Sequence, residues 1–204
     1  MAITSHLEAK ELRHFMKQFF AALVAHREAL NMLNVYPVPD GDTGTNMSMT
    51  AESVVNALKE IPEEAEITEV TSSIAHGSLM GARGNSGVIL SQVLRAFSSE
   101  VGSSGVLDAS SAAKGLSEAA KAAYGAVMTP VEGTILTVVR ESAEAAKETY
   151  EGGGDLLTVV EAALERGKDA LARTPEMLPV LAEAGVVDAG GSGYLLFLDA
   201  LLNV

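Results

Sequence analysis

Two aspartates stand two residues apart in a short glycine-containing segment, Asp40-Gly41-Asp42-Thr43-Gly44-Thr45-Asn46. A tight turn lets their carboxylates converge on one side, and Mg²⁺ prefers one or two such carboxylates together with phosphate and water oxygens. The pattern does not fit an EF-hand, whose sixth and twelfth places would fall on Thr45 and Ala51 instead of Gly and Glu. In a second interpretation, Asp42 or Thr43 simply caps the following helix.

A glycine-rich segment, Gly81-Ala82-Arg83-Gly84-Asn85-Ser86-Gly87, precedes an apolar helical pattern. Its glycines would leave free backbone N–H groups at a helix N-terminus, where the unsatisfied donors and the helix dipole bind anions. No Gly-Lys-Ser or Gly-Lys-Thr occurs in the chain, so this is not a Walker-type loop. An ordinary turn capped by Asn85 or Ser86 is the alternative.

Two further loops carry the same kinds of residue. Thr129 to Thr134 brings Glu132 and the hydroxyl of Thr134 to a helix start, and Gly185 to Gly193 brings Asp188 with four glycines, among them Gly190. In an antiparallel bundle these loops could gather at one end with the two segments above, which favours a binding site over a set of unrelated capped turns.

Two other side chains have less definite roles. His76 lies in a helical pattern, which favours a packed or surface histidine over a catalytic base. Arg83 would either neutralise phosphate charge or offset the acidic surface. The run Glu63-Glu64-Ala65-Glu66 is typical of a solvated face.

Composition predicts the elements that must position these loops. The chain has 204 residues, 48% hydrophobic and mostly Ala, Leu and Val, with 4% aromatic residues, which indicates one all-α domain. A net charge of −13 argues against sequence-independent binding of nucleic acid and against docking on an anionic membrane. Metal ions and backbone N–H groups would therefore supply the positive potential at a phosphate site. The lack of cysteine excludes disulfides and Cys-ligated zinc.

Helical periodicity and capping residues divide the chain into segments. A Ser5–Glu8 capping box would open a first helix that ends near Leu33, followed by an extended Pro-rich segment. No alternating strand pattern stands out. The further helices are predicted at about 45–60, 68–80, 88–99, 109–128, 135–150 and 156–172, then a short one after Pro175 and a last one from Tyr194, with loops at 101–107 and 185–193.

The two ends of the chain bear on its setting. Met1 to Phe15 carries charged residues throughout, so it is not a signal peptide, and the apolar run Phe19 to Ala25 is too short to span a bilayer. We therefore expect a cytoplasmic protein without membrane insertion. The apolar segment Tyr194 to Val204 would be either a buried closing helix or a helix cut where a longer polypeptide continues.

Four blocks of the sequence resemble the ATP-binding subunit of bacterial fatty acid kinases, whose wider family is the nucleotide-binding domain of dihydroxyacetone kinases. They occur in the family order and extend over nearly the whole chain. The blocks are Leu33 to Met47, containing Asn34-Val35-Tyr36-Pro37-Val38-Pro39-Asp40-Gly41-Asp42, then Leu79 to Gln92, Pro130 to Val138 and Gly185 to Gly191.

The resemblance implies an antiparallel barrel of about eight helices with ATP or ADP at one end, bridged by two Mg²⁺ ions to the acidic turn. Asp40 and Asp42 would be metal ligands, and Asn34, one residue out of register and neutral, would take the third ligand position. Thr134 would lie near the transferred phosphoryl group. The residues implied to contact the nucleotide are Thr43, Thr45, Asn46, Gly84, Asn85, Ser86, Gly87, Thr134, Asp188 and Gly190.

In the fatty acid kinases the acceptor is a fatty acid carboxylate held by a separate carrier protein, and the product is an acyl phosphate. The resemblance implies that residues 1–204 are one nucleotide-binding domain at the N-terminal part of a longer polypeptide, inactive without its other domains and able to form a homodimer through the full-length protein. Two alternatives stay open: a dihydroxyacetone kinase subunit, and a non-catalytic nucleotide or metal sensor.

Overall fold

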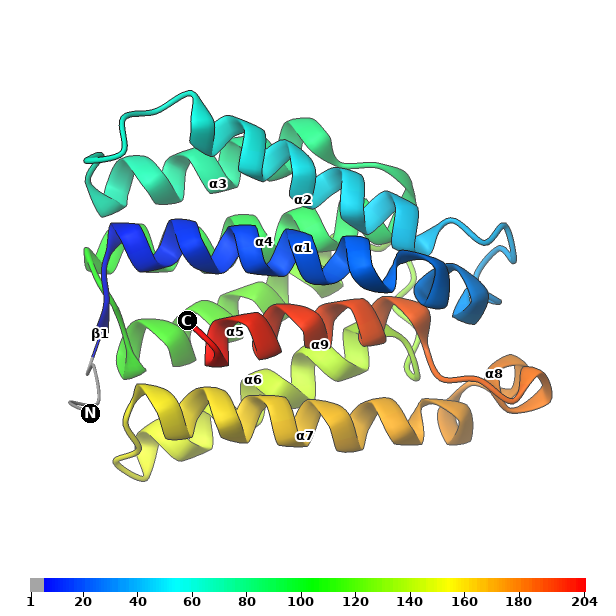
Figure 1. Cartoon of the computed structure of the whole chain (residues 1–204). Helices are drawn as coiled ribbons and strands as arrows, with labels where there is room; N and C mark the ends of the chain where they lie inside the picture. The colour runs from blue at the N-terminus through cyan, green and yellow to red at the C-terminus, as the bar shows by residue number, and fades with distance from the viewer. Residues whose placement is uncertain (1–5) are drawn as a thin grey trace.

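The protein folds as a closed antiparallel ring of helices, as the computed structural model of residues 6–204 shows (Figure 1). Each long helix packs against the next in sequence, and α9 packs back against α1. The predicted all-α barrel of about eight helices is confirmed. Within residues 6–204 the helices are α1 (Ala9–Leu33), α2 (Thr43–Lys59), α3 (Ile67–Gly81), α4 (Gly84–Ser104), α5 (Ala109–Gly125), α6 (Ile135–Glu151), α7 (Leu156–Met177), the short α8 (Pro179–Ala184) and α9 (Ala189–Leu202).

The first helix begins later than predicted. The expected Ser5–Glu8 box falls partly on Ser5, which lies outside the described residues, and the observed capping box instead joins Glu8 to Glu11. Residues before Glu8 are extended because β1 (His6–Leu7) pairs antiparallel with β2 (Leu107–Asp108). No strand was expected from the sequence, and the short pair of β1 and β2 shows that this expectation was wrong.

Packing lengthens several helices at the expense of the predicted loops. The expected loop over 101–107 is wrong, because α4 continues to Ser104 with Val101 buried in the core, and Gly105 then ends it. Burial of an apolar side chain outweighs the low helix propensity of nearby glycine and serine. The last helix starts at Ala189 instead of Tyr194, since Asp188 caps it. By contrast, α5 ends at Gly125, three residues before the predicted end.

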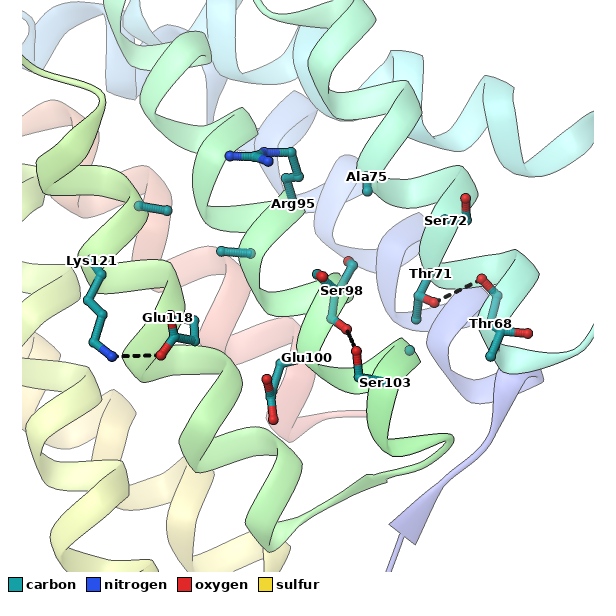
Figure 2. Close-up of a pocket in the computed structure, with 14 residues that line it drawn as sticks. Thr68, Thr71, Ser72, Ala75, Arg95, Ser98, Glu100, Ser103, Glu118 and Lys121 are labelled. Atoms are coloured by element: carbon teal, nitrogen blue, oxygen red, sulfur yellow. Dashed lines mark hydrogen bonds and ion pairs between the residues drawn. The ribbon is translucent and has the colours of Figure 1, made fainter.

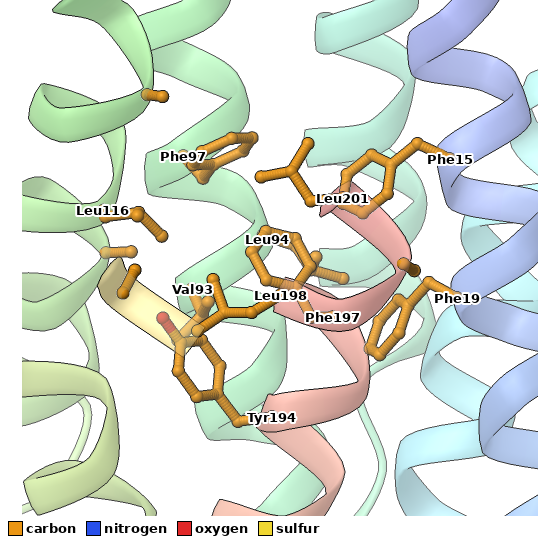
Figure 3. Packing of buried hydrophobic residues seen from close by; sticks show 14 of the residues in the cluster. Phe15, Phe19, Val93, Leu94, Phe97, Leu116, Tyr194, Phe197, Leu198 and Leu201 are labelled. Atoms are coloured by element: carbon orange, nitrogen blue, oxygen red, sulfur yellow. The ribbon is translucent and has the colours of Figure 1, made fainter. Parts of the chain in front are cut away.

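The last helix lies in the middle of the core. Phe197 in α9 makes edge-on contacts with the rings of Phe15, Phe19 and Phe97, at centroid distances of 5.1, 5.6 and 5.3 Å (Figure 3). A helix that is apolar on nearly all sides must be buried. The segment after Tyr194 is thus a buried helix, as the first of the two interpretations predicted, and the second, that a longer polypeptide continues, stays a prediction.

Helix direction places four helix N-termini at one end of the ring. α1, α3, α5 and α7 run toward that end (right in Figure 1), and α2, α4, α6 and α9 begin there. The connections 34–42, 82–83, 126–134 and 178–188 therefore lie together, and four positive helix-dipole ends point at the same region. Over residues 6–204, no helix combines the length and apolarity needed to cross a bilayer.

Candidate functional site

A cavity of about 600 Å³ opens among these four connections. Its lining draws on segments far apart in the sequence, as the predicted gathering of loops requires. The predicted site residues that line it are Asn34, Asp40, Asp42, Thr43, Gly84, Asn85, Ser86, Thr134, Asp188 and Gly190. Three predicted nucleotide contacts, Thr45, Asn46 and Gly87, are not among the lining residues.

The acidic turn presents its carboxylates to this cavity. Asp40 accepts a hydrogen bond of 2.7 Å from the side-chain amide of Asn34, which is buried. Asp42 occupies the N-cap position of α2 but makes no side-chain cap hydrogen bond. The interpretation of Asp42 as a helix cap is therefore wrong, and its carboxylate remains available to a ligand.

These residues fit a hard divalent cation when a phosphate completes the coordination. No three His, Cys, Asp or Glu side chains converge on a metal position within residues 6–204. Mg²⁺ typically needs only one or two protein carboxylates beside substrate and water oxygens, and Asp40 and Asp42 supply them. Asn34 turns its N–H toward Asp40, so its amide must rotate by about half a turn before its oxygen could serve as the third ligand.

The three residues outside the lining support those inside it. Thr45 pairs with Asn31 of α1 through its backbone N–H and its hydroxyl, at 3.1 and 3.2 Å. Asn46 is buried directly beneath Gly84, where an added Cβ would clash with the Asn46 amide. Gly87 likewise faces the hydroxyl of Thr50, 2.6 Å from where a Cβ would lie.

The glycine-rich turn leaves the start of α4 open. Gly84 adopts a positive φ of 57°, a conformation that suits glycine, and the N-cap residue Arg83 makes no side-chain cap hydrogen bond. The side chains of Asn85 and Ser86 line the cavity and have no hydrogen-bond partner among the described residues. The expected turn cap by Asn85 or Ser86 is thus absent, and both side chains can bind a ligand.

The starts of α6 and α9, in contrast, are closed by protein groups. Thr134 caps α6, accepting from the N–H of Leu136 and donating to the carbonyl of Val131 at 2.7 Å. Asp188 accepts from the N–H of Gly191 at 2.6 Å and from backbone N–H groups of Gly190 and Ile135, so one carboxylate joins both helix starts. Burial raises the pKa of Asp188 to about 6, against the opposing effect of these N–H donors.

Arg83 and His76 stand outside the cavity. The guanidinium of Arg83 folds onto the carbonyls of Ala82 and Met80, at 2.9 and 3.5 Å, and the residue is exposed. His76 is an exposed residue of α3, as the surface interpretation predicted. The acidic residues Glu63, Glu64 and Glu66 are exposed, which agrees with a solvated face.

Sequence analysis missed the apolar half of the cavity. Tyr36, Pro37 and Val38 line it from the connection 34–42, and Ala126, Val127, Met128 and Val131 line it from the connection 126–134. The residues after Gly125 were predicted to be helical because they continue the Ala-rich pattern of α5. Only Pro130 and Gly133 indicated a nearby loop.

A second, larger cavity of about 840 Å³ lies away from the four connections, on the outer face of α3, α4 and α5 (Figure 2). None of the predicted site residues lines it. Some of its polar groups pair within one helix: Thr71 bonds the carbonyl of Ile67, Ser103 that of Ser99, and Lys121 the carboxylate of Glu118. We refer to it below as the outer groove.

The protein is thus an all-α domain, a ring of antiparallel helices with a polar cavity where four helix N-termini converge. Residues 37–203 match the family model described as the DAK2 domain, and the chain belongs to this family. The solved structure of the dihydroxyacetone kinase from C. freundii, in complex with AMP-PNP and Mg²⁺, has the same fold, with a TM-score of 0.68 at 18% identity over 94% of this chain and 33% of that one.

Relatives in sequence include proteins of Bacillus subtilis and Staphylococcus saprophyticus. Protein YloV of Bacillus subtilis is 44% identical over 180 residues, which cover 88% of this chain and 32% of the relative. An uncharacterized protein of Staphylococcus saprophyticus is 42% identical over 203 residues, covering 98% of this chain and 37% of the relative. The chain thus spans about a third of the length of these relatives.

Proposed function

We propose that this chain is the Mg·ATP-binding domain of a fatty acid kinase, which transfers the γ-phosphoryl group of ATP to a fatty acid carboxylate held by a carrier protein. The observation that carries the proposal is a set of polar groups that face the cavity and are left unpaired by the protein. Asp42, Asn85 and Ser86 line the cavity without a side-chain partner within residues 6–204, at the starts of two helices whose N-cap residues make no side-chain cap bond.

The phosphates would lie at this open half of the cavity. The N-termini of α2 and α4 offer free N–H groups and the positive ends of two dipoles, which attract anions without any Lys. Asp40 and Asp42, with Asn34 as a candidate third ligand, would hold two Mg²⁺ ions between the chain and the phosphates. The dihydroxyacetone kinase from C. freundii has the same fold and was solved in complex with AMP-PNP and Mg²⁺, which supports this arrangement.

The nucleoside would lie against the other half. Val127, Met128 and Val131 give that wall an apolar surface, which suits an adenine ring. Thr134 and Asp188 also line the cavity, and their polar atoms bind the starts of α6 and α9. In this proposal the start of α6 at Thr134 lies near the transferred phosphoryl group.

Catalysis would depend mainly on position and charge. A carboxylate oxygen of the fatty acid attacks the γ-phosphorus, the bond to the β-phosphate oxygen breaks, and ADP leaves. Bound Mg²⁺ would supply charge neutralisation at the phosphate oxygens. The chain's own residues hold the phosphates: N–H groups of α2 and α4, with the side chains of Asn85 and Ser86 beside them.

The acceptor would arrive with a protein partner. Val38, Val88 and Met128 line the cavity and are also exposed, Met128 fully, so the mouth is bordered by apolar surface. Such surface next to a polar site is typical of a docking region. We expect a fatty-acid-binding carrier protein and further domains of the full-length polypeptide to complete the enzyme, and residues 1–204 alone to bind Mg·ATP without transferring phosphate at a useful rate.

Family membership also supports a second function, that of the ATP-binding subunit of a dihydroxyacetone kinase. The fold relation to the C. freundii enzyme favours it, whereas the motifs from Pro37 to Asn46 favour the fatty acid kinase. A non-catalytic nucleotide sensor would keep the same cavity and lack an acceptor.

Calorimetric titration of ADP with Mg²⁺ and with EDTA tests the binding site, since carboxylates without metal repel phosphates. Equal affinity in the two conditions would contradict the proposal. The full-length protein is then assayed for transfer from ATP to a fatty-acid-loaded carrier and, separately, to dihydroxyacetone with its binding subunit. Binding of ADP without phosphoryl transfer in either assay would favour the nucleotide sensor. Robust acyl phosphate formation by residues 1–204 alone would refute the expectation that this domain needs the other domains for activity.

A further inference from the structure

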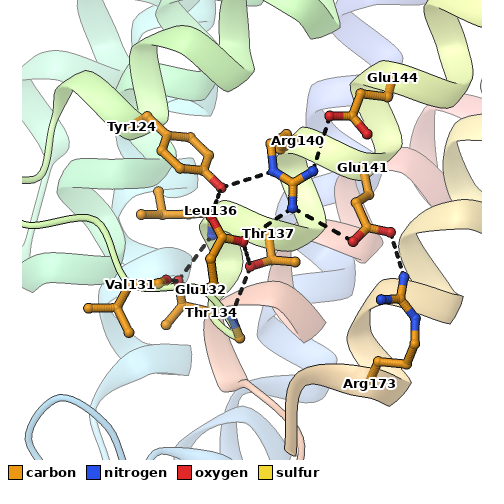
Figure 4. Close-up of polar contacts among 11 residues, drawn as sticks. Tyr124, Val131, Glu132, Thr134, Leu136, Thr137, Arg140, Glu141, Glu144 and Arg173 are labelled. Carbon is orange, nitrogen blue, oxygen red and sulfur yellow. Dashed lines mark hydrogen bonds and ion pairs between the residues drawn. The ribbon is translucent and has the colours of Figure 1, made fainter. Parts of the chain in front are cut away.

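The wall formed by residues 126–136 bends sharply between α5 and α6, and one carboxylate lies at the centre of its hydrogen bonds (Figure 4). Glu132 accepts from the hydroxyl of Tyr124 at 2.7 Å and from the hydroxyl of Thr137 at 2.6 Å. Tyr124 precedes this wall segment in α5, and Thr137 follows the bend in α6. The side chain of Glu132 thus links α5 and α6, the two helices that the wall segment connects.

Thr137 is the buried part of this arrangement. Its hydroxyl donates to Glu132 and accepts from the backbone N–H of Gly133 at 2.8 Å, and the residue is fully buried. Gly133 has a φ of 81°, and an added Cβ would lie 2.9 Å from the Cβ atoms of Met177 and Leu178. The backbone at the bend is therefore fixed on one side by Thr137 and on the other by the end of α7.

Arg140 binds the same carboxylate from outside. It donates to Glu132 at 3.2 Å and to the hydroxyl of Tyr124 at 3.2 Å. Its contacts with Glu144, at 3.1 Å, and with Glu141, at 3.7 Å, lie within α6 and not at the wall. Partial burial acts to raise the pKa of Glu132, but hydrogen bonds from Thr137, Tyr124 and Arg140 outweigh it and lower the pKa. Burial and the bond to Glu132 raise the pKa of Tyr124 to about 12, so its proton is retained.

Neither Glu132 nor Thr137 lines the cavity, whereas Val131 and Thr134, on either side of the bend, do. We propose that Glu132 and Thr137 are positioning residues for the nucleotide. Their hydrogen bonds fix the bend, an arrangement that we call the clasp. The clasp holds Val131 and Thr134 at the distance from the phosphate-binding residues that the bound nucleotide requires. The inference rests on the proposed function. It follows from the general finding that a site displaced by about 1 Å by its supporting residues loses much of its affinity or rate.

Two pairs of substitutions test the clasp by calorimetric titration of Mg·ADP. Thr137→Val keeps the shape of the side chain but removes the hydroxyl, whereas Thr137→Ser keeps the hydroxyl. Glu132→Gln changes the carboxylate that touches the wall, whereas Glu144→Gln removes a carboxylate that binds the same Arg140 within α6 and not at the wall. We expect Thr137→Val to weaken binding about tenfold and Glu132→Gln a few-fold, while the two controls stay within about twofold of wild type.

Each titration is run well below the unfolding midpoint of the variant, so that the folded fraction is the same throughout. The double variant Glu132→Gln/Thr137→Val should bind no more weakly than Thr137→Val alone, because both act through one bend. The exchange rate of the Gly133 amide proton provides a second readout, and it should rise in Thr137→Val and not in Thr137→Ser.

Three results would overturn the clasp. The first is wild-type affinity in both Glu132→Gln and Thr137→Val. The second is equal loss in Thr137→Val and Thr137→Ser, which would indicate packing and not the hydroxyl. The third is equal loss in Glu132→Gln and Glu144→Gln. If Thr137→Val does not fold, the half-exposed Glu132 still gives the comparison with Glu144. Failure of wild type to bind Mg·ADP would instead refute the proposed function itself.

Discussion

The cavity at the convergent helix starts and the outer groove on α3, α4 and α5 differ in how the protein treats the polar groups that line them. The groove is the larger, at about 840 against 600 Å³. In the groove, the hydroxyls of Thr71 and Ser103 bond carbonyls of their own helices, Lys121 pairs with Glu118, and the other polar side chains lie along the helices. In the cavity, Asp42, Asn85 and Ser86 have no side-chain partner within residues 6–204 and lie at the starts of two helices. Unpaired polar groups that converge from separate loops indicate a ligand better than volume does.

The same contrast divides the cavity itself. Of the four helices that begin there, α6 and α9 are capped by their N-cap residues Thr134 and Asp188, whereas the N-cap residues of α2 and α4, Asp42 and Arg83, make no side-chain cap bond. The start of α4, and that of α2 apart from the Thr45 N–H that binds Asn31, can therefore offer N–H groups to phosphate, whereas the starts of α6 and α9 hold loops in place. The predictions below test these differences, beginning with the largest expected effect.

Asp42→Ala should abolish measurable Mg²⁺-dependent ADP binding, a loss of about 100-fold or more, because one of the two carboxylates available to the metal is removed. Helical circular dichroism should stay at the wild-type level, since Asp42 makes no cap bond. Calorimetry with and without Mg²⁺ measures the first effect.

Asp155→Ala is the matched control for this substitution. Asp155 is also an N-cap aspartate, but its carboxylate accepts the N–H of Thr158 at the far end of the bundle. This variant should lower the unfolding midpoint slightly and leave ADP affinity unchanged. A reversal of the two outcomes would mean that Asp42 is the structural cap and that the open half of the cavity is not a metal site.

Gly84→Val should weaken ADP binding by about ten- to 100-fold, because a β-branched residue at a φ of 57° is strained and its Cβ would clash with Asn46. Adenosine affinity should change much less. Gly105→Val places the same strain, at a φ of 74°, on the other end of α4 and should reduce stability without changing binding. Equal loss of adenosine and ADP affinity in Gly84→Val would show that the turn shapes the whole cavity instead of contacting phosphate.

Asp188 should make stability depend on pH. Its pKa is about 6 in the folded protein and lies near 3.8 ordinarily, so the folded state binds the proton more tightly. The stabilisation is complete below about pH 4 and is lost as pH rises through 6, an effect on the order of 2–3 kcal/mol. Urea unfolding of wild type and Asp188→Asn from pH 4 to 8 measures it.

The difference in free energy of unfolding, wild type minus Asp188→Asn, should fall as pH rises through this interval and level off above about pH 7. Using the difference cancels the titration of the other acidic residues. A difference that does not change with pH would show that Asp188 is hydrated, and the closed half of the cavity would then be as open as the starts of α2 and α4.

Particular residues show why sequence predicted the polar half of the site and not the apolar half. Asp40, Asp42, Gly84 and Asn85 belong to short local motifs, and the chemistry of such motifs can be inferred without knowledge of the fold. Antiparallel helices then require the loops between them to alternate between two ends, so the gathering of the four loops was also predictable.

The unpredicted features depend on contacts between distant segments. Ala126 to Met128 continue a helical pattern, and only the fold shows that they leave α5 to form a wall. The paired residues His6 and Leu7 delay α1 because β2 lies beside them, and Val101 extends α4 because the core buries it. Local propensity cannot report any of these contacts.

The smallest expected effect separates the two cavities most directly. Ala126→Leu and Ala96→Leu each add three carbon atoms to a partly exposed alanine, the first in the cavity wall and the second in the outer groove. Ala126 lies at the C-cap of α5 with an ordinary φ of −78°, and Ala96 lies within α4, so neither backbone should resist the change. We expect Ala126→Leu to weaken ADP and adenosine a few-fold each, because the added atoms occupy space beside the nucleoside wall, and Ala96→Leu to stay within about twofold of wild type. Calorimetric titration of both ligands against both variants makes the comparison. If Ala96→Leu weakened ADP binding as much as Ala126→Leu did, the outer groove would be coupled to nucleotide binding, and the distinction between the groove and the cavity would fail.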